Sequence, residues 1–309
     1  MQVKYPPALL NLPLLYQGKS RDSFLAAHEE LMLVVATNRV STHNIVHASQ
    51  IPLKGEVLTM LTIFLFLEVL EKSGIRHHLV AWGTNIYKYL PGRRSDYPAN
   101  LHHYAIIVRR VEIVQIEFIF RAYLCGSLWT KYYSKGLPNP YGIDLPPGLP
   151  LMHRFEAPLF TPTDKSDTDD PRNALEVETR HSTEHAETLR GFTTLRTFFQ
   201  SRNMELVDGK LEGGYFETPT GERIFILADE ISPDSCRLTN ADNITEGVEP
   251  AWRDKEIVRT VATKMWGDRE KVPLAFPPDV LEAVTKTYLS VLEQATGMDI
   301  ETFRKEWLD

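Results

Sequence analysis

The sequence is poor in cysteine and has no long apolar run. Its two cysteines, Cys125 and Cys236, form no CxxC pair, which excludes a disulfide framework and disfavours a thiolate zinc site. We expect both thiols to be reduced, as is usual in the cytosol. The most apolar stretch, 63–70, contains Glu68 and is far shorter than the roughly 20 residues that cross a bilayer. We therefore predict a cytoplasmic protein without a membrane partner.

Positive charge is also in short supply. Lys and Arg number 34 against 41 Asp and Glu, for a formal net charge of −7 at pH 7. Binding nucleic acid by neutralising its phosphates needs an excess of positive charge, so we predict no nucleic-acid partner. The balance still permits a local basic pocket for a small phosphorylated ligand. The GxGxxG, P-loop and HExxH motifs are absent, and the histidine pairs at 77–78 and 102–103 are predicted to lie on the surface.

What is present is an irregular succession of strands and helices, long enough at 309 residues for two lobes. A strand is predicted at 31–37, and 105–110 with 112–122 form either two strands or a strand and the start of a helix. A hairpin of 204–207 and 224–228 is connected through Gly213-Gly214 and 219–221. Helices are predicted at 55–71, 173–203, 255–266 and 278–296. The stretch 136–170, rich in Pro, Gly and Asp, is a long ordered loop or a lid. Because strands and helices do not alternate as in βαβ units, we predict an α+β fold.

Two short glycine-containing segments carry groups suited to phosphate. In 18–22 (GKSRD), a glycine precedes Lys19 and Arg21 in a turn, where backbone N–H groups and cations can approach phosphate oxygens. In 121–127, Arg121 and Ser127 flank Gly126, which permits close approach of a ligand. Taken alone, the first segment is better explained as a solvated turn.

Alternating charges in 207–212 (VDGKLE) form a third candidate. In an extended segment Asp208, Lys210 and Glu212 are two residues apart and project to one face. They form either a surface charge ladder or, in a pocket, a site where carboxylates hold Mg²⁺ and the ammonium contacts an anionic substrate.

A fourth candidate follows the apolar strand 224–228. The acidic pair Asp229 and Glu230 comes directly after it and leads into a turn with Ser235 and Arg237. Hard carboxylate oxygens near phosphate-binding groups are how Mg²⁺ is normally held. Because the two charged segments belong to one predicted hairpin, together they predict a Mg²⁺–nucleotide site. The charged loop 160–170 (FTPTDKSDTDD) is either a mobile lid over charged ligands or a solvated loop.

These motifs, in this order, resemble the SAICAR synthetase family (phosphoribosylaminoimidazole-succinocarboxamide synthase). The resemblance runs through nearly the whole chain and is carried by short segments in register: GKSRD, ATNRVSTHN, IPLKGEVLTMLTIFLF, RRVEIVQIEFIFRAYLCGS, APLFTPTDKSD, VDGKLEGG, ADEISPDSCRL and YLSVLEQATG.

The resemblance implies an ATP-dependent carbon–nitrogen ligase of purine biosynthesis. Such an enzyme joins carboxyaminoimidazole ribonucleotide to L-aspartate through an acyl phosphate and yields SAICAR, ADP and phosphate. ATP and Mg²⁺ are implied as cofactors, and small-molecule substrates as partners of a monomer or homo-oligomer. The implied fold has a small antiparallel β lobe that binds ATP (1–114) and a larger α+β lobe with the Mg²⁺ and substrate site (115–309), with ATP between them.

The resemblance also assigns the ATP-side residues. Lys19 and Arg21 would contact the ATP phosphates. The segment 112–117, with Glu112 at its start and Glu117 at its end, would be the hinge against which adenine stacks and forms hydrogen bonds.

On the metal and catalytic side, Glu212 and Asp229 would bind Mg²⁺ with Glu230 close by. Asp208 and Lys210 would face the carboxylate and amino group of the imidazole substrate.

On the substrate side, the ribose phosphate would be bound by Arg121, Ser127 and Arg237, with Ser235 beside them. Asn44 stands where the family pattern DRISAFD ends in a carboxylate, because this sequence reads NRVSTHN. An amide there can donate as well as accept hydrogen bonds.

This and two further departures, VDGKLEGG for VDxKxEFG and TDKSD for an STKAE-like run, leave an alternative open. It is a paralogous ligase that couples a related azole carboxylate nucleotide to an amino acid, for example in nucleoside antibiotic biosynthesis. A non-catalytic nucleotide-binding relative is disfavoured, since Lys19, Lys210, Glu212 and Asp229 are all present.

Overall fold

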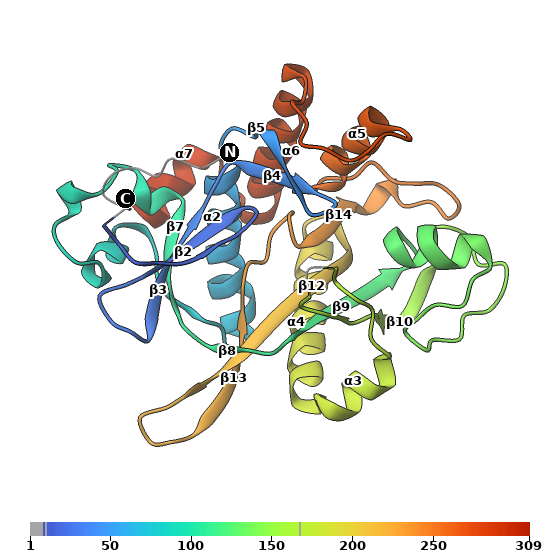
Figure 1. Cartoon of the computed structure of the whole chain (residues 1–309), viewed down its shortest axis with the longest axis horizontal. Helices are drawn as coiled ribbons and strands as arrows, with labels where there is room; N and C mark the ends of the chain where they lie inside the picture. Colours follow the sequence, from blue (N-terminus) through green and yellow to red (C-terminus); the bar gives the residue numbers. More distant parts are fainter. Residues whose placement is uncertain (1–8, 10, 167) are drawn as a thin grey trace. The chain divides into compact units, whose positions relative to one another are not determined.

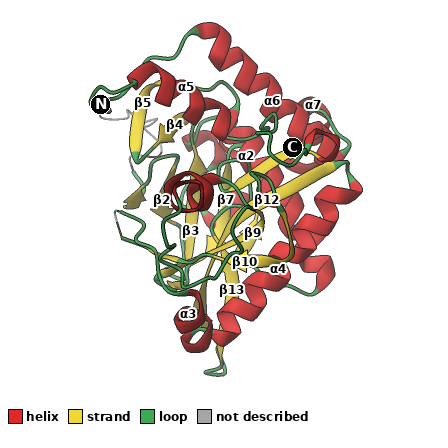
Figure 2. Ribbon diagram, turned by 90° about the vertical axis from the view of Figure 1, so that its right-hand side faces the viewer, coloured by secondary structure: helices red, strands yellow, loops and turns green. Residues whose placement is uncertain are grey.

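Strands and helices are intermixed in the computed structural model, which describes residues 9, 11–166 and 168–309 (Figure 2). The predicted α+β class is confirmed, with sheets that are antiparallel. The chain folds into two units, which comprise Met1–Phe66, His78–Arg110 and Lys255–Asp309 in the first and Leu67–His77 and Val111–Asp254 in the second. The break at 110/111 is close to the predicted 114/115 boundary. The C-terminal helices, however, belong with the N-terminal strands.

The first unit is built on a five-stranded sheet. Its strand order is β1 (Leu14–Gln17), β2 (Arg21–Leu25), β3 (Leu31–Ala36), β7 (Ala105–Arg109) and β6 (Leu79–Ala81). In β3 the side chains of Leu31, Leu33 and Val35 are buried at alternate positions, as a half-covered strand requires. A separate two-stranded ribbon consists of β4 (Arg39–Thr42) and β5 (Ile45–Gln50).

The first helix of this unit is α2 (Lys54–Phe64), which occupies most of the predicted helix 55–71. A Cβ at Gly55 would lie 2.8 Å from the Ala36 carbonyl oxygen, so only glycine allows α2 this close to β3. The others are α5 (Glu256–Trp266), α6 (Pro278–Thr296) and α7 (Ile300–Phe303). α6 contacts α2, which is why the C-terminal segment joins this unit. The short helical turns are η3 (Gly83–Tyr89), η4 (Arg94–Asp96), η5 (Leu101–His103) and η9 (Arg304–Leu308).

The second unit is a sheet in which β12 (Met204–Glu217) is the central strand. Its main path is β10 (Arg154–Phe160), β9 (Ile116–Tyr123), β12 and β13 (Arg223–Ala228). Three short strands extend it: β8 (Glu112–Ile113), β11 (Thr163–Asp164) and β14 (Cys236–Asn240). The β12–β13 hairpin and helix α4 (Ser182–Ser201), which contacts β12, can be followed in Figure 1. The remaining elements are α3 (Ala174–Arg180) and the turns η1 (Leu65–Leu70), η2 (Glu71–Ser73), η6 (Leu128–Tyr132), η7 (Tyr133–Lys135) and η8 (Ala241–Asn243).

The predicted connection through Gly213-Gly214 is wrong. Both glycines lie inside β12, paired with Leu227 and Ile226, and the turn follows Glu217. The Phe225 ring occupies the space beside Gly213, where a Cβ would lie 2.2 Å from its Cζ. A pair of glycines here therefore makes room for neighbours and does not mark a turn.

Three other predictions, on the stretch 136–170, the cysteines and the histidine pairs, can be compared with the structure. The stretch 136–170 is ordered but includes β10 and β11, and its Asp167 lies outside the described residues. Cys125 and Cys236 are free and buried, and burial raises the pKa of each thiol to about 12. The prediction of two surface histidine pairs is wrong, because His78 and His102 are buried. Across the described part of the chain, no helix combines the length and the apolar character needed to cross a bilayer.

Candidate active site

Two neighbouring strands, β9 and β12, carry charged side chains at alternate positions. Their register places Asp208 opposite Arg121 and Lys210 opposite Ile119. Because side chains two residues apart share a face, Glu117 and Arg121 of β9 lie on one face with Asp208, Lys210 and Glu212 of β12. The contacts divide this row into a cationic end and an acidic end.

The cationic end consists of two guanidinium groups on one carboxylate. Nη1 of Arg121 and Nη1 of Arg237 each donate to the same Oδ2 of Asp208, both at 2.6 Å. Arg121 also donates to the Ser127 hydroxyl at 3.2 Å and to that of Thr161 at 3.0 Å. Two guanidinium groups converge here on one carboxylate. With the Ser127 hydroxyl they are suited to a phosphate group.

Glycine at position 126 is required for this arrangement. Gly126 has φ +57°, and a Cβ there would lie 2.1 Å from Nη1 of Arg237. We predict that Gly126→Ala displaces the Arg237 guanidinium and weakens the binding of inorganic phosphate at this end at least about tenfold, as expected for the loss of a charge-assisted hydrogen bond. Titration of the protein with phosphate measures the dissociation constant. As a control, Gly136→Ala imposes a similar positive φ of +64° where a Cβ would meet nothing within 4 Å. Equal changes in both variants would contradict the role given to Gly126.

The acidic end surrounds one lysine. Lys210 Nζ lies 2.7 Å from Glu117 Oε1 and 2.5 Å from Glu212 Oε1. Burial alone would lower the pKa of Lys210, but Glu212, Glu117 and Asp229 together raise it above its usual value. Lys210 therefore stays protonated at neutral pH and acts as a fixed positive charge, not as a base.

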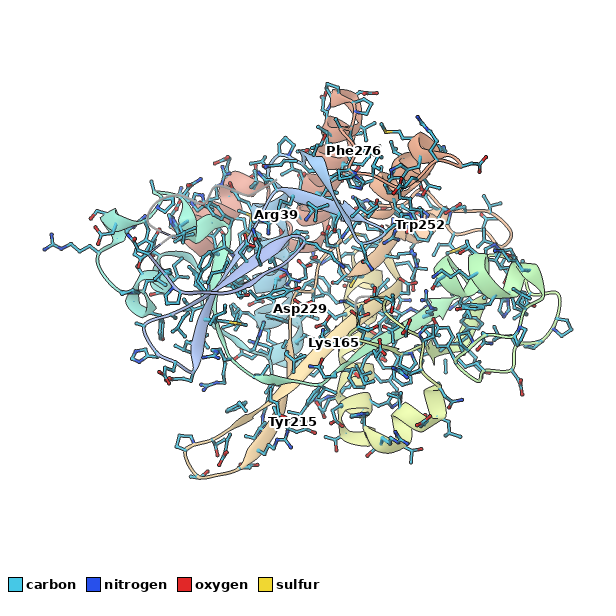
Figure 3. All side chains as sticks on the ribbon, viewed as in Figure 1. Arg39, Lys165, Tyr215, Asp229, Trp252 and Phe276 are labelled. Atoms are coloured by element: carbon cyan, nitrogen blue, oxygen red, sulfur yellow. The ribbon has the colours of Figure 1, made fainter. Side chains whose placement is uncertain are left out.

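Lys165 also joins this end, from the charged loop after β11. It forms an ion pair with Glu212, and Figure 3 shows it beside β12. From the sequence, the loop 160–170 was described as a lid or a solvated loop, and no role was assigned to Lys165. The sequence feature that could have indicated one is a lysine within a dense run of Thr, Ser and Asp.

The loop after β13 brings the remaining carboxylates. Asp229, labelled in Figure 3, has φ +69°, and Glu230 is buried. The Ser235 hydroxyl is used inside this loop, where it donates to the carbonyl oxygens of Glu230 and Ser232 at 3.2 Å. The Ser235 carbonyl accepts from the Lys210 backbone N–H at 3.0 Å. Ser235 therefore ties the loop to β12.

Glu112 does not share the surroundings of Glu117. It is exposed on β8 and pairs with Arg223 of β13, with 2.6 Å between Oε2 and Nη2. Gly214 lies opposite β8, and a Cβ there would be 2.6 Å from the Glu112 carbonyl oxygen. Of the two glutamates at the ends of the predicted hinge segment, Glu117 belongs to the charged row and Glu112 does not.

The first unit holds the other predicted residues, Lys19, Arg21 and Asn44. The turn between β1 and β2 closes with the Gly18 N–H donating to the Arg21 carbonyl oxygen at 2.7 Å. Lys19 Nζ donates to Asn44 Oδ1 at 2.7 Å. Asn44, which stands where the family pattern has a carboxylate, therefore contacts Lys19, a residue that is predicted to bind ATP.

Arg39 and Asp22, which sequence reasoning missed, hold this turn. Arg39 donates to the Gly18 carbonyl oxygen at 2.9 Å and forms a two-bonded ion pair with the fully buried Asp22, at 2.7 and 3.0 Å. The signal was an aspartate at a buried strand position, which requires a cationic partner.

Comparison with known proteins assigns this chain to a family. Residues 14–273 match the SAICAR synthetase family model. The chain is 30% identical over 311 residues to the phosphoribosylaminoimidazole-succinocarboxamide synthase of Stenotrophomonas maltophilia (strain K279a), covering 95% of this chain and 96% of that protein. The solved SAICAR synthase of Saccharomyces cerevisiae complexed with SAICAR superimposes with a TM-score of 0.80 at 26% identity, over 97% of this chain and 98% of that one.

A SAICAR synthetase (Type-2) in complex with ADP shows the same fold, with a TM-score of 0.64 at 20% identity over 92% of this chain and 98% of that one. The chain belongs to the SAICAR synthetase family, whose members are ligases of purine biosynthesis.

Proposed function

We propose that this chain is an ATP- and Mg²⁺-dependent ligase that joins carboxyaminoimidazole ribonucleotide to L-aspartate, giving SAICAR, ADP and phosphate. The observation that carries the proposal is the charged row on β9 and β12, with guanidinium groups at the Arg121 and Arg237 end and carboxylates around Lys210 at the other. The guanidinium groups suit the phosphate of the substrate. At the other end, Lys210 and a Mg²⁺ ion held by the carboxylates would offset the negative charge of the reacting carboxylate. The family relatives and the ADP complex of a fold neighbour support it.

In the proposed reaction, an oxygen of the azole carboxylate attacks the γ-phosphorus of ATP and ADP leaves. The aspartate amine then attacks the acyl carbon, phosphate leaves, and the nitrogen loses a proton. Arg121, Ser127 and Arg237 would hold the ribose phosphate throughout. Lys210, being protonated, would offset negative charge that develops on the carboxylate and transferred phosphoryl group. Lys19 would contact ATP phosphates.

The donor set fits Mg²⁺, because it consists of hard carboxylate oxygens next to groups suited to phosphate. Glu212 and Asp229, with Glu230, would hold the ion. Bound there, Mg²⁺ would neutralise phosphate charge. Asp229 already acts electrostatically on Lys210, as does Glu212, so the two carboxylates share one neighbourhood.

A paralogous ligase for a related azole carboxylate nucleotide is the second candidate. It is favoured by Asn44, whose amide oxygen accepts from Lys19, and by Gly213, where the space beside the backbone is filled by Phe225 of the neighbouring strand. Both positions differ from the family pattern.

A coupled ADP-release assay with Mg²⁺, ATP, carboxyaminoimidazole ribonucleotide and L-aspartate tests the proposal. We expect ADP release that requires all four components. Turnover with a related azole carboxylate nucleotide, but none with this substrate pair, would establish the second candidate instead. Asn44→Asp is expected to change KM for the azole substrate or for ATP, because it gives Lys19 a charged partner. Unaltered constants would show that position 44 does not set specificity.

A further inference from the structure

The unit that contains α2 carries a cluster of two imidazoles and a carboxylate that the proposed ligase reaction does not use. His102 and His103 end the turn η5, and Asp309 follows η9. Nε2 of each histidine lies 3.0 Å from the same oxygen, Oδ1 of Asp309. One ligand atom from each of the three residues lies within 4.8 Å of the others. These are the atoms and the spacing of a three-ligand metal site.

Each ring also has an oxygen partner behind it. The Tyr87 hydroxyl lies 3.1 Å from Nδ1 of His102. Glu56 Oε2 lies 4.0 Å from Nδ1 of His103, and Arg304 holds that carboxylate through Nε at 3.0 Å and through Nη2. In metal sites, such partners on the second ring nitrogen select the tautomer and orient the ligand.

Backbone contacts position the carboxylate. The Asp309 N–H donates to the Arg304 carbonyl oxygen at 2.9 Å. Gly83, with φ +56°, allows the last turn to approach, because a Cβ there would lie 2.6 Å from the Leu308 carbonyl oxygen. The position of Asp309 in the cluster is therefore fixed by the packing of η3 against η9 and by the backbone of its own turn.

The cluster lies at the surface on one side. The His102 side chain is buried, whereas that of Asp309 is 53% exposed, so the carboxylate end of the cluster is in contact with solvent.

We propose that His102, His103 and Asp309 bind one divalent transition-metal ion of the Zn²⁺ class through two Nε2 atoms and a carboxylate oxygen. Two imidazoles and one carboxylate, completed by water, form a tetrahedral set typical of Zn²⁺. Mg²⁺ and Ca²⁺ prefer all-oxygen sites and are not expected here. With the metal on Nε2, the Nδ1–H of His103 faces Glu56. The ion would link η5 to the C-terminal turn.

Titration of the full chain with Co²⁺, followed by its visible absorption, tests this proposal. Nucleotide is omitted, and millimolar Mg²⁺ is present to occupy all-oxygen sites. We expect saturation at one Co²⁺ per chain and displacement by Zn²⁺. His103→Ala and Asp309→Ala should lose the saturable absorption, and Tyr87→Phe should weaken binding about tenfold. His28→Ala, which removes an exposed histidine of the same unit, should bind as the wild type does.

Circular dichroism establishes that the variants are folded. Asp309→Ala serves if His103→Ala does not fold, because the Asp309 side chain is half exposed. Absence of saturable Co²⁺ binding in the wild type, or equal binding in the wild type and the folded ligand variants, would overturn the proposal and leave the cluster as an ion pair only. Neither result bears on the ADP-release assay, so the two proposals fail separately.

Discussion

Replacing Asp229 by asparagine is expected to abolish Mg²⁺-dependent ADP release, with a loss in kcat of at least about a hundredfold, as when a single preorganised electrostatic group is removed. The substitution removes one negative charge from the proposed metal site and weakens the field that keeps Lys210 protonated. The fold should be preserved. Asp229 has φ +69°, and asparagine tolerates this left-handed conformation and has the same shape.

The measurement is the rate of ADP release as a function of Mg²⁺ concentration, with circular dichroism and thermal unfolding as checks on the fold. Asp242→Asn is the matched control. It makes the same chemical change in the same unit, at a carboxylate whose partner is Asn203, at 3.0 Å. Its rate and Mg²⁺ dependence should equal those of the wild type. If Asp229→Asn also retains them, the metal role of Asp229 is wrong.

The second large effect is expected from Asp208→Ala, which should lower the free energy of unfolding by about 3–5 kcal/mol. Asp208 is the shared partner of two guanidinium groups, and Arg121 is only 4% exposed. Removing the carboxylate takes away the negative charge that the two guanidinium groups share and leaves them repelling one another. The cost comes mainly from this change in electrostatics, not from the hydrogen bonds themselves.

Urea unfolding of the single and double variants separates the repulsion between the two guanidinium groups from the loss of their hydrogen bonds. Asp208→Ala combined with Arg237→Met removes one of the two positive charges, so the double variant should be more stable than Asp208→Ala alone. Inorganic phosphate should raise the unfolding midpoint of Asp208→Ala more than that of the wild type, because the anion takes the place of the carboxylate. A loss below about 1 kcal/mol, without an effect of phosphate, would contradict the account of this end as an anion site.

Local sequence patterns predicted some elements of the fold correctly and others wrongly. The helix α6 was predicted at its exact bounds, because Pro278 and Gly297 at its two ends act through local backbone geometry. β3 likewise follows from apolar residues in an unbroken run. Gly213-Gly214 misled, since glycine in a turn and glycine under a neighbouring ring look the same in sequence.

The positions of the charged residues were likewise predicted only in part. That Asp208, Lys210 and Glu212 share one face was predicted, because they alternate along one strand. Glu117 and Arg121, however, were not predicted to join them. Their pairing was not predicted. Asp208 turned out to bridge two arginines, while Lys210 joins Glu117, which lies 93 positions earlier in the chain. Such pairing depends on strand register, which a single sequence does not display.

By itself, then, the sequence determined the α+β class, most of the helices, the strands of the most apolar segments, and the resemblance to the SAICAR synthetase family. These follow from local propensity, periodicity and motif order. Tertiary structure alone decided that the C-terminal helices pack with the N-terminal strands, that Lys165 joins Glu212, and that His102 is buried beside Asp309. Each of these is a contact between distant segments. Burial and packing select such contacts from many alternatives that the same residue types would allow.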